Sequence, residues 1–239
     1  MFLRESFSLL FFLLPTLALT NHLHFRVKRS SSLAATLLST RNELVCDIDK
    51  ALSRNQNPDS LLQRLENLNK LDAPNRSPQH AGLWYVWYTD CPPPSNGKLG
   101  PFSGSSQQFI SPEGNGYQNL LDVNGWLTAT LDGIWEEWDG RLLEESLMDE
   151  ESDTKEPFRD WGANHWKVTF IRLQIALFGL PIFTQTFPAK TSRIWRTTFL
   201  DDDIRIVRAG KTGRREDESV FYTKRTPPLD GKVASPSNE

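Results

Sequence analysis

The sequence predicts a mainly β protein in which two amphipathic helices precede a closed antiparallel barrel of about eight strands. Two observations support this fold class. Apolar residues recur at three- and four-residue intervals over 37–71, as in amphipathic helices, and from Ala81 onward they occur in short runs bounded by turn residues, as in β-strands. With 239 residues and 38% hydrophobic content, the chain can bury one sizeable core but has little room for a second domain.

The N-terminal segment has the composition of a targeting sequence. Residues 7–19 are almost entirely apolar, follow Arg4, and form a run shorter than the about 20 residues that span a bilayer. The chain is then basic and rich in serine, with no acidic residue until Glu43. We therefore expect a signal peptide at 1–20 and a transit-peptide-like segment at 21–36, which together indicate delivery to a plastid. Secretion through an ordinary signal peptide is the alternative.

Two helices are expected over 37–71. Asn57-Pro58-Asp59 divides this segment, because proline is tolerated at the start of a helix but not in its interior. The polar face carries charges of both signs rather than the excess of Lys and Arg that is typical of membrane-surface helices. We expect the apolar face to cover an end of the barrel, with contact to lipid as the alternative.

The barrel is expected over 82–225. Asn124-Gly125 between two apolar runs is the strongest hairpin signal, and a shift in the apolar phase near Arg172 predicts a β-bulge within a long strand. Because eight strands with short turns leave no exposed edge once they close, a barrel is preferred to an open sheet. The Pro- and Ser-rich tail at 226–239 is expected to be disordered. The predicted strands are 84–88, 107–110, 117–123, 126–135, 165–177, 194–200, 204–207 and 219–224.

Composition and motifs exclude several classes of function. A net charge of -3 without a long basic stripe argues against a nucleic-acid partner. Cys46 and Cys91 have no C-x-x-C spacing or histidine cluster near them, so two free thiols are expected, with no zinc site and no disulfide framework. The acidic segment at 144–156 lacks the spacing of a calcium loop. We therefore expect neither a cofactor nor a metal.

The chain also carries none of the motifs of nucleophilic, phosphate-binding, zinc-dependent or dinucleotide-dependent catalysis. Asp201, Asp202 and Asp203 are adjacent, so their side chains point in different directions and do not converge on one substrate. A tight turn in which they bind local backbone, with Arg205 or Arg208 compensating their charge, accounts for them. We expect a protein that is not an enzyme.

Two segments carry a resemblance to a known family. Trp195 to Arg208 reads W-x-T-T-[FY]-L-D-x-D-x-R-I-x-R, and Gly82 to Thr89 forms a Gly-x-Trp strand that is followed by Gly100-Pro101-Phe102 and Gln107-Gln108. Together they resemble the plastid lipid-associated proteins, or fibrillins, from about Leu33 to Arg225. The resemblance implies a lipocalin-like barrel at thylakoids or plastid lipid droplets (plastoglobules), with acyl lipids, carotenoids or prenylquinones as ligands. It supplies no catalytic residues.

Aromatic and basic side chains of the predicted strands are the candidates for a binding site inside the barrel. Large aromatics can wall a pocket for an acyl or isoprenoid chain, with core packing as the alternative. Arginines can bind a lipid carboxylate, sulfate or phosphate, with pairing to a buried acid as the alternative. The candidate ligand-binding residues are Trp84, Trp126, Trp166, Phe170, Trp195, Phe199, Arg196 and Arg205.

The sequence leaves three functions open. The first is a non-enzymatic plastid protein that binds or coats hydrophobic small molecules or lipids at a peripheral membrane or lipid-droplet surface. The second is a barrel scaffold that stabilises an enzyme of isoprenoid or quinone biosynthesis at a membrane. The third is a secreted lipocalin-like carrier. A hollow apolar interior favours carriage, whereas an interior packed with aromatic side chains favours scaffolding.

Overall fold

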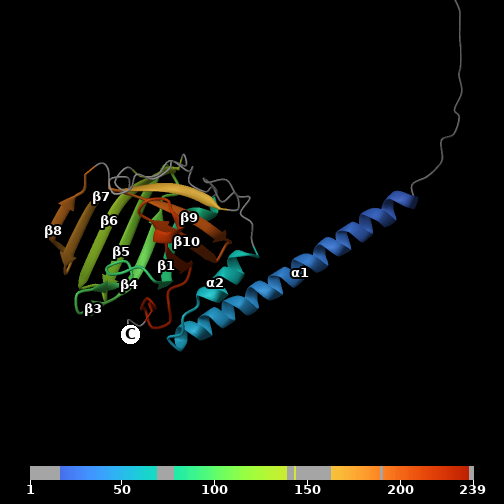
Figure 1. Ribbon diagram of the computed structural model, residues 1–239, viewed down its shortest axis with the longest axis horizontal. Coiled ribbons are helices and arrows are strands. Elements are labelled where there is room, and N and C mark those ends of the chain that lie inside the picture. The colour runs from blue at the N-terminus through green and yellow to red at the C-terminus, as the bar shows by residue number, and fades with distance from the viewer. Residues whose placement is uncertain (1–16, 69–77, 139–142, 144–162, 189–190, 237–239) are drawn as a thin grey trace, which may run out of the picture. The chain divides into compact units, whose positions relative to one another are not determined.

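A computed structural model describes residues 17–68, 78–138, 143, 163–188 and 191–236 (Figure 1). Within them the protein is mainly β: eight antiparallel strands close into a barrel, and two helices precede it. The expected fold class is confirmed. Most of the expected signal peptide and the acidic segment at 144–156 lie outside the described residues.

The chain divides into two compact units, residues 1–43 and 44–239, and helix α1 (Leu17–Ser53) contributes to both. The helix begins earlier than the predicted start at residue 37, within the expected targeting segment. Leu37 and Leu38, in the first unit, are exposed. No helix among the described residues is long and apolar enough to cross a membrane.

The break between the two helices falls where the sequence predicts it. Helix α1 ends at Ser53 and helix α2 spans Asp59–Glu66. Asn57 Oδ1 accepts a hydrogen bond from the backbone N–H of Asp59 (2.8 Å), and the carbonyl of Pro58 accepts the first helical bonds of α2. An asparagine and a proline thus begin the second helix at a fixed residue.

The barrel closes in the order β6-β5-β4-β1-β11-β10-β9-β7, and β7 pairs again with β6. Each of these strands overlaps one of the predicted strands. Their bounds are β1 (Gly82–Thr89), β4 (Ser105–Ile110), β5 (Gly116–Val123), β6 (Leu127–Glu137), β7 (Asn164–Leu177), β9 (Ser192–Leu200), β10 (Ile204–Gly210) and β11 (Ser219–Lys224). The short strands β2 (Lys98–Leu99) and β3 (Phe102–Ser103) form a separate hairpin, and single 3-10 turns occur at Pro78–His80 and Arg215–Asp217.

The helices of the second unit cover the side wall of the barrel, which corrects the expectation that they cover an end. Leu44 and Ile48 of α1 and Leu62 and Leu65 of α2 are buried on the outer face of β9, β10 and β11. Their partners on the strands are Phe199, Ile204, Ile206, Val220 and Tyr222. These three strands are therefore buried on both faces, which explains why almost every residue of β9 and β10 is buried.

Strand β7 contains the expected bulge. On β6, Asp132 pairs with Arg172 and Gly133 pairs with Phe170, so Ile171 is the extra residue. A Cβ atom at Gly133 would lie 2.8 Å from a backbone oxygen of β7, so only glycine fits opposite the bulge. The extra residue shifts the alternation of β7, which is why the apolar phase changes in the sequence.

A further strand, β8 (Leu180–Thr186), is absent from the prediction. It pairs with residues 172–177 of β7, whereas β9 pairs with residues 164–169 of the same strand. Phe178-Gly179 joins β7 to β8 with φ angles of 48° and 79°, as in a type I′ turn. Asparagine or aspartate usually precedes the glycine of such a turn. Because phenylalanine stands there instead, the sequence does not indicate this hairpin. Figure 1 shows β8 at the edge of the sheet.

The C-terminal tail is ordered over 226–236, where disorder was expected. Ala234 forms a parallel bridge with Tyr88 of β1. Its carbonyl accepts from the N–H of Thr89 (3.1 Å), and its N–H donates to the carbonyl of Trp87 (3.0 Å). Backbone pairing fixes this segment although its composition is typical of a disordered tail.

Replacing Ile48 with alanine tests the helix–wall contact. Ile48 is 0% exposed, so Ile48→Ala should lower the free energy of unfolding by about 2–5 kcal/mol through lost burial and a cavity. Leu38→Ala, at an exposed position of the same helix, should change it by less than about 0.5 kcal/mol. Equilibrium denaturation measures both. Equal effects would show that the helix does not pack as described.

Candidate functional site

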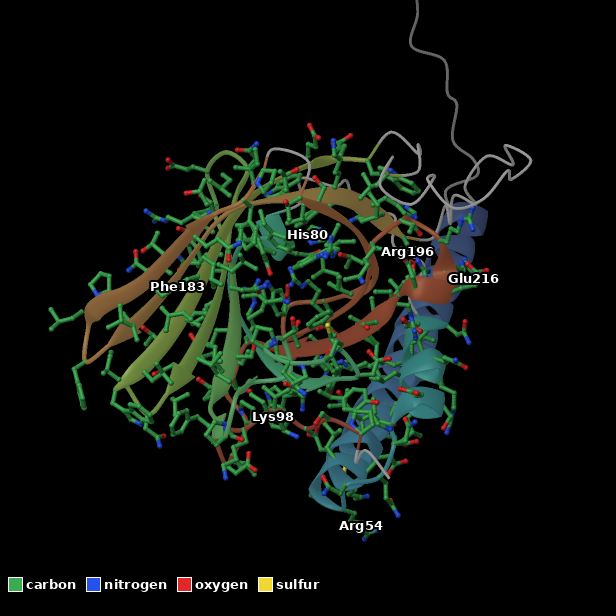
Figure 2. All side chains as sticks on the ribbon, turned by 60° about the vertical axis from the view of Figure 1, so that its left-hand side comes forward. Arg54, His80, Lys98, Phe183, Arg196 and Glu216 are labelled. Carbon is green, nitrogen blue, oxygen red and sulfur yellow. The ribbon has the colours of Figure 1, made fainter. Side chains whose placement is uncertain are left out.

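One part of the barrel interior is filled by aromatic side chains, and Figure 2 shows His80 within the barrel. Trp135 and Trp166 stack with ring centroids 4.1 Å apart, and Tyr117 meets Trp195 edge-on at 4.8 Å. The His80 ring lies 4.6 Å from Trp166, and all five side chains are buried. We call this part the closed end. Trp166 and Trp195, both predicted ligand-binding residues, pack here as core.

Two further candidates belong to the same core. Trp84 is fully buried, and its indole N–H donates to the carbonyl of His80 (2.8 Å). Phe170 is partly buried and packs against this aromatic cluster from β7, one residue before the bulge. These candidates face the interior as expected, with other side chains as their neighbours.

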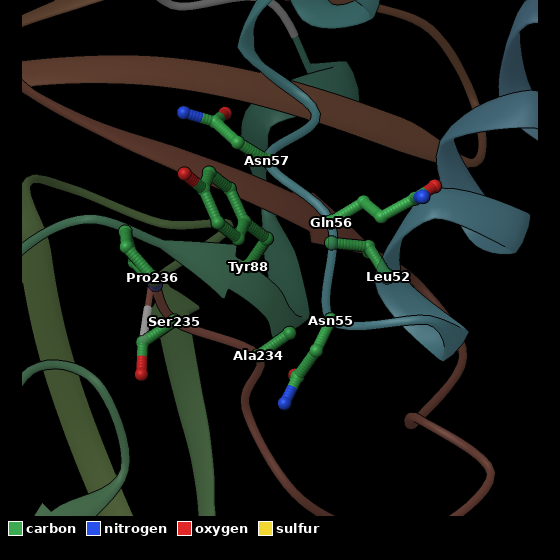
Figure 3. A pocket seen from close by; sticks show the side chains of 8 residues that line it. All are labelled: Leu52, Asn55, Gln56, Asn57, Tyr88, Ala234, Ser235 and Pro236. Carbon is green, nitrogen blue, oxygen red and sulfur yellow. The ribbon is translucent and has the colours of Figure 1, made fainter. Parts of the chain in front are cut away.

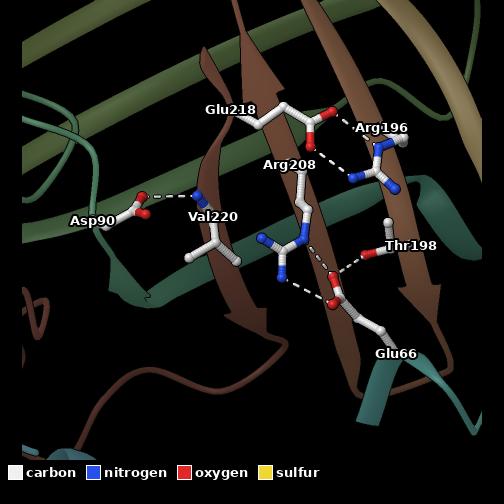
Figure 4. Close-up of polar contacts among 7 residues, drawn as sticks. All are labelled: Glu66, Asp90, Arg196, Thr198, Arg208, Glu218 and Val220. Atoms are coloured by element: carbon white, nitrogen blue, oxygen red, sulfur yellow. Dashed lines mark hydrogen bonds and ion pairs between the residues drawn. The ribbon is translucent and has the colours of Figure 1, made fainter. Parts of the chain in front are cut away.

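Phe199 and Arg196 have structural partners instead. Phe199 packs in the cluster between the helices and the side wall, so it does not face the barrel interior. Arg196 Nε and Nη2 donate to the two carboxylate oxygens of Glu218 at 2.9 and 2.6 Å (Figure 4). Arg196 thus follows the alternative of a guanidinium paired with an acid.

A second paired arginine joins helix α2 to the wall. Arg208 Nε and Nη2 donate to the carboxylate of Glu66 at 2.8 and 2.9 Å, and Thr198 Oγ1 donates to the same carboxylate at 2.6 Å (Figure 4). In the same view, Asp90 accepts from the backbone N–H of Val220 (2.8 Å). The contacts of Glu66 fix the position of helix α2 on β9 and β10, whereas that of Asp90 joins the end of β1 to β11.

The three consecutive aspartates form the expected turn. Asp201 Oδ1 accepts from the backbone N–H groups of Asp203 (2.9 Å) and Ile204 (2.8 Å), which connects β9 to β10. The cation that interacts with Asp202 and Asp203 is Arg225 rather than either arginine of β10; partial burial lowers the pKa of Arg225, and these two carboxylates oppose that shift. The turn is structural.

Arg205 differs from the other two arginines. It is 0% exposed, it projects from β10 into the barrel, and its Nη2 donates to Oε1 of Gln108 on β4. Its guanidinium carbon lies 5.3 Å from the centre of the Trp84 ring, within the range of a cation–π contact. Burial lowers the pKa of Arg205 to about 9. Among the described residues, no carboxylate pairs with it.

His80 lies beside this arginine as a neutral imidazole. Its Nε2 is 3.0 Å from Nδ2 of Asn164, which donates to it. Burial, followed by the nearby charges of Arg205 and Arg225, lowers the pKa of His80 to about 3. Among the residues that the structure describes, the interior of the closed end therefore holds one cation, Arg205, beside the neutral imidazole of His80.

The other end of the barrel presents an apolar inner face. Residues paired across β6, β7 and β8 share the face of Trp135, because directly opposed residues of antiparallel strands point to the same side. The apolar residues among them, which we call the apolar wall, are Leu127, Ala129, Leu131, Leu173, Ile175, Leu177, Leu180 and Phe183; Gln185, opposite Leu173, is a polar residue on the same face. β7 leaves β9 beyond Thr169 and carries the exposed strand β8 there, so the wall is only partly covered. Figure 2 shows Phe183 on this projecting hairpin.

Three loops gather at this open end through an aromatic cluster that we call the apolar tip, formed by Phe102, Trp126 and Phe178. Phe102 meets Trp126 edge-on at 5.0 Å, and the rings of Trp126 and Phe178 are 6.4 Å apart. The N–H of Phe178 donates to the carbonyl of Trp126 (2.7 Å). Trp126 is thus the one predicted ligand-binding residue that lies at the open end.

A hollow outside the barrel is too small for a lipid. It lies between the end of α1, β1 and the tail, and Leu52, Tyr88 and Pro236 are among its lining residues (Figure 3). Its empty volume of about 210 Å³ includes open solvent. Ligand pockets typically enclose about 300 Å³ or more, so this hollow is not the candidate site.

The thiols and acids of the described residues form no further centre. Cys46 and Cys91 are both free, and burial raises the pKa of the Cys91 thiol. No group of three or more His, Cys, Asp or Glu side chains lies together in the described part of the chain as a metal site would require. The candidate site is therefore the interior of the barrel, from Arg205 to the apolar tip.

The fold and this site define a class: a closed antiparallel β-barrel with an aromatic closed end and an apolar open end. Comparisons with protein-family models, curated proteins and solved structures found no match to the chain.

The pKa of His80 predicts an acid-sensitive barrel. Its folded pKa of about 3 lies below the ordinary 6.5, so His80 contributes stability that is complete above pH 6.5 and is lost as the pH falls toward 3. Between pH 7 and pH 5 the wild type should lose about 2 kcal/mol more than His80→Gln, which cannot take up this proton. Denaturant titration at both pH values measures the difference. Equal losses would show that His80 does not remain neutral in the fold.

Proposed function

We propose that this chain is a non-enzymatic lipid-associated protein that binds hydrophobic metabolites at the open end of its barrel and sits at a lipid surface. The observation that carries the proposal is the exposure of the β7–β8 hairpin. Phe178 and Leu180 are 75% and 70% exposed, and Ile182 and Phe183 are also exposed. A contiguous exposed apolar patch on a protein surface marks a partner, a membrane or a ligand.

The charge around the apolar tip supports a lipid surface as the partner. The segments 96–104, 124–126 and 178–186 contain no Asp or Glu, and Lys98 is their one charged residue. Anionic lipid head groups would therefore meet no repelling carboxylate in these loops. Tryptophan and phenylalanine are also the side chains that peripheral proteins place at the boundary between head groups and acyl chains.

The backbone at Phe178 gives a second line of support. A non-glycine residue with φ of 48° is uncommon, and bulky side chains are disfavoured there. Asparagine or aspartate would form the same turn at lower cost. A strained position that keeps a large exposed apolar side chain is a candidate for function rather than for stability.

The resemblance of 195–208 and 82–89 to the plastid lipid-associated proteins agrees with this proposal. We extend the proposal to membership of that family and to acyl lipids, carotenoids or prenylquinones as the ligand classes. Because Trp135, Trp166 and Trp195 fill the closed end, the apolar part of the ligand would lie on the apolar wall rather than among these rings.

The scaffold function is the second candidate, and the packed aromatic core favours it. An interior filled by stacked tryptophans supports a rigid barrel that presents its outer surface to an enzyme of isoprenoid or quinone biosynthesis. The two candidates differ in what the exposed hairpin contacts: a lipid surface in the first, a protein in the second.

Changing the β7–β8 hairpin tests the lipid surface. Phe178→Ser combined with Leu180→Ser should weaken binding to vesicles of phosphatidylcholine and phosphatidylglycerol at least about tenfold, because the burial of two large apolar side chains is lost. Vesicle co-flotation measures the bound fraction.

The matched control is Leu83→Ser combined with Phe109→Ser. These two residues pair on the outer face of β1 and β4 and are also exposed. This variant should bind vesicles like the wild type. If the wild type itself does not bind vesicles, the lipid-surface proposal fails and the scaffold function takes its place.

The N-terminal composition supports a plastid location reached through a signal and a transit-like segment, with secretion as the alternative. A fluorescent reporter behind residues 1–36, expressed in an alga whose plastid lies within an endomembrane compartment, should enter the plastid. Replacing Arg26, Lys28 and Arg29 with glutamate should divert it to the secretory route, since transit peptides are basic and poor in acids. Secretion of the unchanged reporter would contradict the plastid location.

A further inference from the structure

Arg205 is a buried cation whose hydrogen-bonding capacity is mostly unused. Its Nη2 donates to Gln108, whereas its Nε and Nη1 have no hydrogen-bond partner among the described residues. These two nitrogens carry three of the five N–H donors of a guanidinium. By contrast, Arg196 and Arg208 each bind a glutamate with two nitrogens. A buried charge without a partner is costly, so this arrangement requires a reason.

Buried donors without a partner among the described residues lie near Arg205, together with the Tyr117 hydroxyl, which donates to Asn119. Asn164 Nδ2 donates to Nε2 of neutral His80, which places the His80 proton on Nδ1, and that atom has no partner in the described part of the chain. The indole Nε1 of Trp166 is also buried without a partner there. A further cation, Arg225, has its guanidinium carbon 3.5 Å from the centre of the Trp84 ring, and its charge adds to the lowering of the pKa of Arg205. An interior with unused donors and a net positive charge is suited to an anion.

Strand register places this donor-rich centre next to the apolar wall. Gln108, the partner of Arg205, is directly opposite Asn119 of β5, and Asn119 is opposite Leu131 of β6. Leu131 is in turn opposite Leu173 of β7. Neighbours in such a ladder lie about 5 Å apart, so the polar centre and the wall are continuous along one inner surface. An amphiphile fits this surface, with its anionic head at the polar centre and its apolar chain along the apolar wall.

We propose that Arg205 binds the carboxylate of a long-chain carboxylic acid whose chain lies along the apolar wall toward the open end. The inference rests on the proposed function, since it names the class of lipid that the wall receives. The carboxylate supplies the missing counter-charge and accepts charge-assisted hydrogen bonds from Arg205, while Gln108 holds the guanidinium in place. Leu131, Leu173 and Ile175 cover the first part of the chain, and Phe183 covers the part near the exit.

Isothermal titration with oleate and oleyl alcohol tests the assignment, because the two probes share a chain and differ in head-group charge. The wild type should bind oleate at least about tenfold more tightly than the alcohol, a difference of about 1.4 kcal/mol, because only the carboxylate can form a charge-assisted hydrogen bond with Arg205. Arg205→Met should bind both probes with equal affinity and leave the affinity for the alcohol unchanged. Arg172→Met, on the outer face beside Asp132, should keep the preference of the wild type.

The outcomes separate this inference from the proposed function. Equal affinity of the wild type for both probes means that the wall binds lipid but Arg205 selects no carboxylate, which overturns the inference alone. A preference for oleate that persists in Arg205→Met overturns it as well. If neither probe binds, lipid carriage by the wall fails together with the inference.

A second measurement needs no variant and decides the question if Arg205→Met does not fold. Oleate labelled with ¹³C at its carboxyl carbon reports the ionisation of the bound head group by NMR. Beside the Arg205 guanidinium the bound carboxyl should have a lower pKa than oleate dispersed in detergent micelles. A pKa equal to or above the micellar value would show that the head group does not meet the cation, and would overturn the inference.

Discussion

The structure depends on one shared strand. β7 pairs with β6 over residues 166–177, with β9 over residues 164–169 and with β8 over residues 172–177. The first half closes the barrel, because without the β7–β9 ladder both strands would present unpaired edges. The second half, displaced by the bulge at Ile171, carries the hairpin away from the closed sheet. Closure at one end and exposure at the other thus follow from the length of a single strand.

Electrostatics divides the arginines of the C-terminal motif into two roles. Arg196 and Arg208 lie on the outer side of their strands and pair with Glu218 and Glu66, so each charge is compensated where the strands are covered. Arg205 alternates to the inner side, where Gln108 supplies a neutral oxygen. The period of two along β10 therefore places Arg205 and Arg208, which are three residues apart, on opposite faces of the strand. It also places a buried positive charge inside the barrel.

Most of the fold could be predicted from the sequence because the signals were local. Each of these signals determines the conformation of only a few neighbouring residues. They are the alternation of apolar residues, the Asn124-Gly125 turn and the proline at residue 58, and the structure has the expected strands, turn and helix start at these positions. The bulge near Arg172 was also visible, as a change of apolar phase. β8 could not be predicted because Phe178 occupies a turn position that usually holds asparagine or aspartate. The order of the tail could not be predicted because it comes from pairing with β1.

The candidate site could be predicted only in part, since burial and pairing are not local properties. Trp84, Trp166, Trp195 and Phe170 face inward as aromatic patterns suggest, but they contact one another, and Phe199 faces the helices. The sequence by itself determined which residues alternate and where the chain turns, because these follow from backbone geometry. The tertiary structure decided that Arg205 meets no carboxylate among the described residues and that Leu173, Ile175 and Phe183 form one partly open wall. Both features depend on which strands become neighbours. Closure of the barrel decides this by pairing strands that are far apart in the sequence.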